Sequence, residues 1–380
     1  MMKALFFFEW KLFWSNIKNI VALAVFIFLC LYLTLAVEPD YRPNRAIEYD
    51  EIAATNRDAN YFIENNDPEI FQRSIPLFQE IAASSETLLE ALEQEDYQTV
   101  MELEPTYYSQ NMSRFSGQDP NYYVFGVPEG ERNRKKTYDN LATTSHYEFL
   151  RDGNYVLSLE IIEGRTALQA LTRQLMGILP LILFLIVIIY GMDIFAADKH
   201  HQTIVNELPL SKYKRLGVKS LVVFSAFILT LILGTSIFVL LTGLRTGFGG
   251  FNLPVPQMQF NLSIGQFLLQ TILLLALIAL IFSRSMAWGS LLINQPIVNL
   301  LFIPLIFAGS LWHETGITYG HPEISFLPPT FFRVGDVISG FLNFWYSSEF
   351  ITFGTGIGIL STLLLMIELL NLVTIRIQKD

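Results

Sequence analysis

LVVFSAFILTLILGTSIFVLLTGL, residues 221–244, contains no Lys, Arg, Asp or Glu. The hydrocarbon core of a bilayer is about 30 Å thick, so a helix needs roughly 20 consecutive apolar residues to cross it. Backbone polar groups cannot be left unpaired in lipid, so a stretch of this kind is expected to be helical. Residues 221–244 therefore predict a membrane-spanning helix.

Five further segments are almost free of charge and extend this prediction to six spans. With residues 221–244, they place transmembrane helices at 20–37, within 166–197, and at 264–282, 286–311 and 349–374. The 52% hydrophobic and 14% aromatic content and the positive mean hydropathy are also typical of membrane proteins. We expect an all-α polytopic membrane protein, with a very short turn around Ser283 to Trp288 joining the fourth and fifth spans.

The charge of the chain is concentrated between the first two spans. Residues 38–165 hold 25 acidic and 11 basic residues, a net charge of −14, whereas the rest of the chain has a net charge of +4. This segment is long enough to bury a small core of its own. Apolar residues at three- and four-residue spacing predict a helix over 75–103, and residues around Asp152-Gly153 fit either a hairpin or a helix end with a turn. We predict an acidic, mostly helical extracellular domain.

Lys and Arg set the expected orientation, because they are enriched in cytoplasmic segments. They place both termini inside, with a cytoplasmic tail at 375–380 and an extracellular or re-entrant segment at 312–348. Residues 1–19 fit an amphipathic helix in the cytoplasmic interface, or an extension of the first span. The only cysteine is Cys30, and an external domain without disulfides favours a bacterial plasma membrane.

Residues 198–220 form the longest and most basic cytoplasmic loop of this topology. Pro209 is expected to divide it into two short helices, and Ser211 to cap the second. A short amphipathic helix on the cytoplasmic face is a natural docking element for a partner protein. The alternative is a solvated loop whose lysines only set the topology.

DIFAADKHHQTIVNELPLSKYKRLGVKSL, residues 193–221, resembles the junction of the second and third spans in ABC-2 type ABC transporter permeases. In that family an acidic residue leads into a loop, followed by an LP-[IL]-S motif, a basic stretch, and a Gly before a Lys. Here these features are Asp198, residues 208–211, residues 212–215, and Gly217 followed by Lys219. The sequence departs from the pattern at residues 200–202, where the family commonly has an acidic residue and a Gly before Thr.

The resemblance implies a permease subunit of an ATP-driven exporter, which pairs with itself or a sister permease. Two separate ATPase subunits would bind ATP and dock on the loop, at Asp198, Lys199, His200, His201, Leu208, Pro209, Lys212, Tyr213 and Lys214. The chain contains no GxxxxGK[ST] phosphate loop, so we expect no enzyme activity, cofactor or metal site of its own. In the fifth span, polar side chains either line a translocation path or pack against other helices, at Asn294, Gln295 and Asn299.

The substrate class stays open between an antimicrobial or amphipathic peptide, a lipid-like molecule and an ion. Membrane lipids are expected partners, and nucleic acids are not. A second hypothesis is a non-transporting receptor or immunity protein whose acidic extracellular domain binds a cationic peptide. In that case the spans serve only as an anchor.

Overall fold

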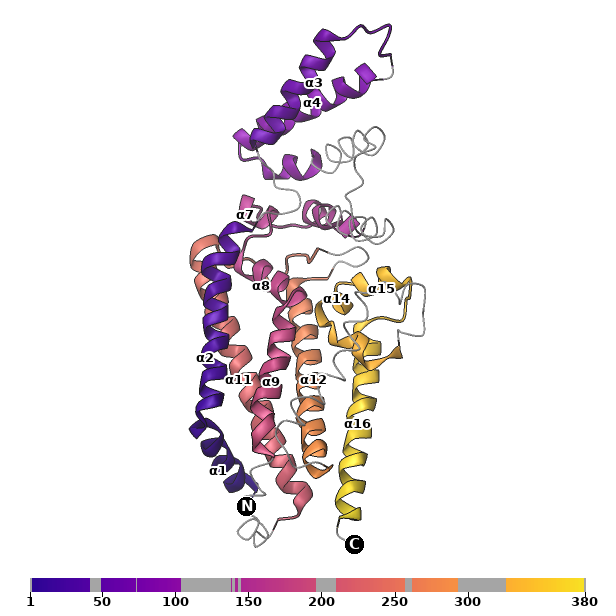
Figure 1. Ribbon diagram of the computed structural model, residues 1–380. Coiled ribbons are helices and arrows are strands. Elements are labelled where there is room, and N and C mark those ends of the chain that lie inside the picture. The colour runs from indigo at the N-terminus through magenta and orange to yellow at the C-terminus, as the bar shows by residue number, and fades with distance from the viewer. Residues whose placement is uncertain are drawn as a thin grey trace.

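The structure is a computed structural model in which long helices lie side by side in a bundle (Figure 1). Both chain termini lie at one end of the bundle, which we call the terminal end. Beyond the opposite end lie the described residues between 49 and 165, which we call the head. The described residues are 2–41, 49–72, 74–103, 138, 141–142, 145–195, 210–256, 262–292 and 326–378. Within these ranges the chain is helical with no strand, which confirms the expected all-α class.

Among the described residues, four helices are long and apolar enough to cross a membrane. They are α2 (Ile17–Tyr32) with its continuation to Asp40, α11 (Lys212–Thr246), α12 (Ile264–Leu292) and α16 (Phe353–Ile377). A fifth candidate consists of α7 (Leu159–Ile162) and α8 (Ala167–Met176), followed after a 65° bend by α9 (Leu179–Ile194). These helices coincide with the predicted spans at 20–37, 166–197, 221–244, 264–282 and 349–374.

The turn expected between the fourth and fifth predicted spans is wrong. Helix α12 continues without a break through Ser283 and Trp288 to Leu292, so the predicted span start at residue 286 lies inside a helix. The polar residues here have partners that keep them helical. Ser283 donates its hydroxyl to the Leu280 carbonyl at 3.0 Å, and the Arg284 side chain is paired within the bundle. The remainder of 286–311 lies outside the described residues.

The first helix, α1 (Met2–Ser15), is separate from the first span. Asn16 lies between them in an extended conformation, and its side chain accepts the Lys18 N–H at 3.1 Å, which starts α2. The reading of residues 1–19 as an extension of the first span is therefore wrong. Helix α1 packs against α11, and it buries Glu9 and Phe13.

Ser211 caps α11, as expected, because its hydroxyl accepts the Lys214 N–H at 3.4 Å. The second short helix predicted within 198–220 does not exist as a separate element. Residues 212–220 are the first turns of the 35-residue α11. Gly217 does not interrupt the helix, although glycine is a weak helix former.

The head contains two helices, α3 (Tyr49–Asn65) and α4 (Ser74–Glu93), which pack against each other in its outer part (Figure 1). Their contact includes the rings of Phe62 and Phe78, which stack with centroids 4.0 Å apart. The single helix predicted over 75–103 is interrupted after Glu93. Glu95 has a φ of 54°, and Asp96 caps a new helix over 97–103 by accepting the Thr99 N–H and hydroxyl.

At Asp152-Gly153 the structure has a helix end and not a hairpin. The helical segment from residue 145 ends at Asp152, and the Gly153 N–H bonds the Phe149 carbonyl at 3.1 Å. The chain then continues without regular structure to α7. The described part of the head is thus mostly helical, as expected.

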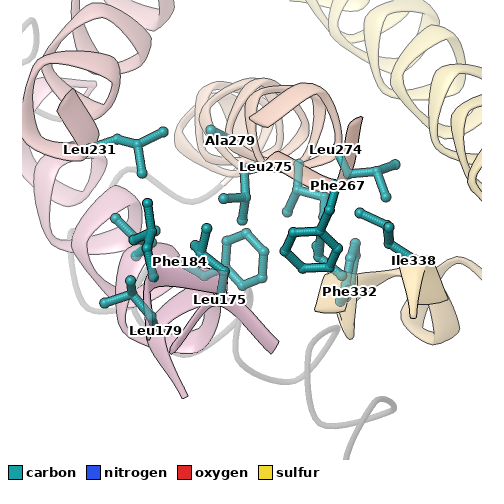
Figure 2. Packing of buried hydrophobic residues seen from close by; sticks show 14 of the residues in the cluster. Leu175, Leu179, Phe184, Leu231, Phe267, Leu274, Leu275, Ala279, Phe332 and Ile338 are labelled. Atoms are coloured by element: carbon teal, nitrogen blue, oxygen red, sulfur yellow. The ribbon is translucent and has the colours of Figure 1, made fainter. Parts of the chain in front are cut away.

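The described part of the segment 312–348 contains short helices. A 3-10 turn at Pro328–Phe332 is followed by α14 (Val334–Ile338) and α15 (Phe341–Tyr346). Figure 2 shows Phe332 of the 3-10 turn and Ile338 of α14 in the core of the bundle. They lie there with side chains from α8, α9, α11 and α12, including Leu175, Phe184, Leu231, Phe267 and Leu274. A Cβ on Gly335 would lie 2.4 Å from the Met176 Cα, so α14 approaches α8 backbone to backbone.

Candidate functional site

The terminal end of the bundle contains an ion pair between α12 and α16. The Arg284 guanidinium contacts both carboxylate oxygens of Glu368, Nε on Oε1 and Nη2 on Oε2, the second at 2.7 Å. Arg284 is buried, and the side chain of Glu368 is 25% exposed. Paired charged hydrogen bonds of this kind fix the direction as well as the distance between two helices.

The first turns of α11 join this ion pair. The Tyr213 hydroxyl donates to Glu368 Oε2 at 2.9 Å, and the Arg284 Cζ lies 5.4 Å from the Tyr213 ring centroid. Arg284 also donates from Nη1 to the Ser220 hydroxyl at 3.2 Å. Three helices that are far apart in sequence therefore share one polar cluster.

Further hydrogen bonds extend this cluster toward the end of α16. Lys212 donates to the Gln378 side-chain oxygen at 2.7 Å, and the Gln378 amide donates to the Leu291 carbonyl at 2.7 Å. Asn371 donates to the Arg284 carbonyl at 3.2 Å. We call this set the α11–α12–α16 network, which consists of Lys212, Tyr213, Ser220, Arg284, Glu368, Asn371 and Gln378.

A second polar cluster lies where α1, α2, α9 and α11 meet. The Lys18 ammonium bonds the Ile189 carbonyl at 2.6 Å and lies 2.7 Å from an Asp193 carboxylate oxygen. Lys219, which is 3% exposed, donates to the Ile194 carbonyl at 2.8 Å, and its Nζ lies 3.8 Å from Glu9 Oε1. We call this set the α1–α9 network, which consists of Glu9, Lys18, Asp193 and Lys219 with the carbonyls of Ile189 and Ile194.

Together the two networks hold both ends of the segment that connects α9 to α11. The α1–α9 network contacts the last turn of α9, at Asp193 and Ile194. The α11–α12–α16 network contacts the first turn of α11, at Lys212 and Tyr213. A displacement of the connecting segment would therefore act on α1, α2, α12 and α16 as well as on the helices that it joins.

The structure describes three of the residues predicted for the coupling loop. Lys212 and Tyr213 belong to the α11–α12–α16 network, and Lys214 contributes its N–H to the Ser211 cap while its side chain is exposed. The other coupling-loop residues lie outside the described residues: Asp198, Lys199, His200, His201, Leu208 and Pro209. So do the predicted path residues, Asn294, Gln295 and Asn299.

Sequence reasoning missed the residues that hold the site together. Neither Arg284 nor Glu368 was among the candidate site residues. A charge next to a long apolar stretch is costly to bury unless it is paired. The position of Arg284 in the sequence therefore indicated that it has a partner. The partner could not be read from the sequence, because 84 residues separate Arg284 from Glu368.

Comparison of the chain with protein-family models, curated proteins and solved structures gives no match.

Proposed function

We propose that this chain is the permease subunit of an ATP-driven ABC exporter. Six spans, both termini in the cytoplasm and an extracellular head in a bacterial plasma membrane belong to this proposal. Its sequence support is the junction at residues 193–221, which resembles that of ABC-2 permeases. Its structural support is that the two networks hold the flanks of this junction to the rest of the bundle.

In this function, an ATPase docked on residues 198–214 moves the junction when it binds and hydrolyses ATP. On the α11 side, Tyr213 and Lys212 pass the displacement to α16, and through Glu368 to Arg284 on α12. On the α9 side, Asp193 passes it to Lys18 on α2. A rigid connection of this type lets a small displacement favour one of two access states.

The transmembrane unit requires a second permease, either another copy of this chain or a sister chain. The outermost spans support this requirement, because only 28% of the residues in the first span and 22% in the last are buried within the chain. The apolar faces that remain are suited to lipid or to a second permease. The transported molecule is an amphipathic peptide, a lipid-like molecule or an ion, and the path includes Asn294, Gln295 and Asn299.

The uncoupling test changes the proposed docking surface and leaves the networks in place. Leu208→Asp with Lys214→Glu alters one apolar and one basic group on the junction, and Lys214 uses only its backbone in the cap. The matched control is Ile70→Asp with Arg57→Glu, at two exposed positions of the head. We expect the junction variant to lose ATPase binding and ATP hydrolysis by the complex, whereas the control keeps both. Unchanged assembly and hydrolysis in the junction variant would contradict the proposal.

The net charge of −14 on residues 38–165 supports one alternative, a receptor or immunity protein that captures a cationic peptide. That function needs no ATPase, so it predicts that the junction variant behaves as the unaltered chain. It also predicts that charge reversal in the head abolishes peptide binding at low salt.

A further inference from the structure

A cavity of about 380 Å³ lies where the head meets the bundle. Its wall combines Tyr41 after the first span, head residues between 138 and 164, one face of α8, the loop at 254–256, and the segment 333–341. This volume falls in the range of small-molecule sites, roughly 300–1,000 Å³. The first residue of α12, Ile264, also lines the cavity. Because segments far apart in the sequence build the wall, the cavity is a feature of the tertiary fold and not of one loop.

Aromatic rings supply much of the apolar surface of this cavity, and two of them are held in place by the bundle. Tyr138 donates its hydroxyl to the Ser339 carbonyl at 2.7 Å, and its ring lies 5.1 Å from the ring of Phe341. The Arg173 guanidinium carbon lies 3.4 Å from the ring centroid of Tyr41. Rigid aromatic walls favour a ligand with an apolar or aromatic body.

The charged residues in the described wall have oppositely charged partners. Arg173 pairs with Glu38 and also donates to the Gly164 carbonyl at 2.9 Å. Arg333 pairs with Asp336 at 2.6 Å, and Glu163 pairs with Arg165 at 2.6 Å. A charged ligand would have to separate one of these pairs or enter without a counter-charge, and both are unfavourable.

One polar group in the wall lacks a partner. His146 is 5% exposed, and its Nδ1 has no hydrogen-bond partner among the described residues. Burial lowers the pKa of His146 to about 4, so the imidazole is neutral at pH 7. A neutral imidazole has one N–H donor and one acceptor nitrogen. Nδ1 is enclosed by the protein, so the neutral ring adds only an uncharged surface to the wall.

We propose that this cavity binds a small, uncharged molecule with an apolar or aromatic body. This body lies against Tyr41, Tyr138 and Phe341, and the charged groups of the wall stay in their pairs. The site requires no ATPase and no transport, so the proposal is independent of the function proposed above.

A cysteine reporter tests this proposal in the full chain in lipid nanodiscs. Cys30 is the only native cysteine and is buried in the first span, so Cys30→Ala gives a background without thiols. Ala142→Cys places a thiol in the cavity wall, and Val156→Cys places a control thiol on the head at a position that is 91% exposed. An uncharged maleimide then reports the access to each thiol.

Three probes of similar size compare the charge of the ligand: 2-naphthol, naphthalene-2-sulfonate and 2-naphthylmethylammonium. We expect 2-naphthol to slow the labelling of Ala142→Cys in a saturable manner, and the two ions to leave it unchanged. The labelling of Val156→Cys should not respond to any probe. Equal protection by either ion, or no protection by 2-naphthol, would overturn the proposal. Ser339→Cys provides a second cavity reporter if Ala142→Cys does not fold.

Discussion

Arg284 on α12 contacts both carboxylate oxygens of Glu368 on α16, and the Tyr213 hydroxyl on α11 donates to the same carboxylate. This arrangement connects three helices at the end of the bundle where both termini lie (Figure 1). Tyr213 also belongs to the proposed coupling junction. The ion pair therefore has a role in stability and a proposed role in coupling, and different variants separate the two.

Removal of Glu368 should destabilise the bundle, because it leaves the buried Arg284 without its counter-charge. We expect Glu368→Leu to lower the free energy of unfolding by about 2 kcal/mol, since the Glu368 side chain is 25% exposed and part of the charge is screened. Thermal unfolding in detergent measures this. Arg284→Met with Glu368→Leu should recover part of the loss, because neither charge remains, and the exposed Arg376→Gln should change little. A double variant less stable than Glu368→Leu would contradict the explanation.

Tyr213→Phe removes one hydroxyl and keeps the ring. We expect a loss of about 1.5–3 kcal/mol, the net contribution of one hydrogen bond to a charged acceptor. The effect should disappear in the Glu368→Leu background, because the acceptor is then absent, and a double-mutant cycle measures this coupling. Tyr61→Phe, at an exposed position of the head, is the matched control. Equal effects of Tyr213→Phe in both backgrounds would show that the hydroxyl acts elsewhere.

Two helical glycines with different surroundings should respond to alanine in opposite directions. A Cβ on Gly335 would lie 2.4 Å from the Met176 Cα, so Gly335→Ala must separate α14 from α8 and should destabilise by roughly 1–3 kcal/mol. A Cβ on Gly358 in α16 meets nothing within 4 Å, so Gly358→Ala should be neutral or stabilising by up to about 1 kcal/mol. Thermal unfolding compares the two variants directly, and equal effects would contradict the close contact at Gly335.

Acid should destabilise the fold through His146. Its pKa falls from 6.5 to about 4 on folding because burial disfavours the charged form. The unfolded chain therefore binds more protons between these values, and stability is lost as the pH falls from about 6.5 to 4, by at most roughly 3 kcal/mol. Glu163, Arg173, Arg333 and Asp336 line the same cavity, so the pH series is compared with His146→Phe. We expect the variant to lose this component of the acid dependence, and parallel curves would refute it.

The spans were largely predictable, because a membrane-spanning helix is specified by local composition. The prediction of a turn at Ser283–Trp288 was wrong because the charge of Arg284 interrupts an apolar stretch of the sequence. Its partner Glu368 becomes a neighbour only in the fold. The break after Glu93 had a local signal, since Asp96 three residues before Thr99 is a typical N-cap. The cavity at the head had no local signal, because segments far apart in the sequence build its wall.

The attachment of this chain to an ATPase is tested most directly by purification of the tagged full chain from its native membrane in mild detergent. Mass spectrometry then identifies the proteins that accompany it in stoichiometric amounts. The proposed function predicts an ATPase that carries the GxxxxGK[ST] phosphate loop, together with ATP hydrolysis by the purified complex. Recovery of the chain alone, or only with a secreted peptide, would contradict the permease function and favour the receptor or immunity protein.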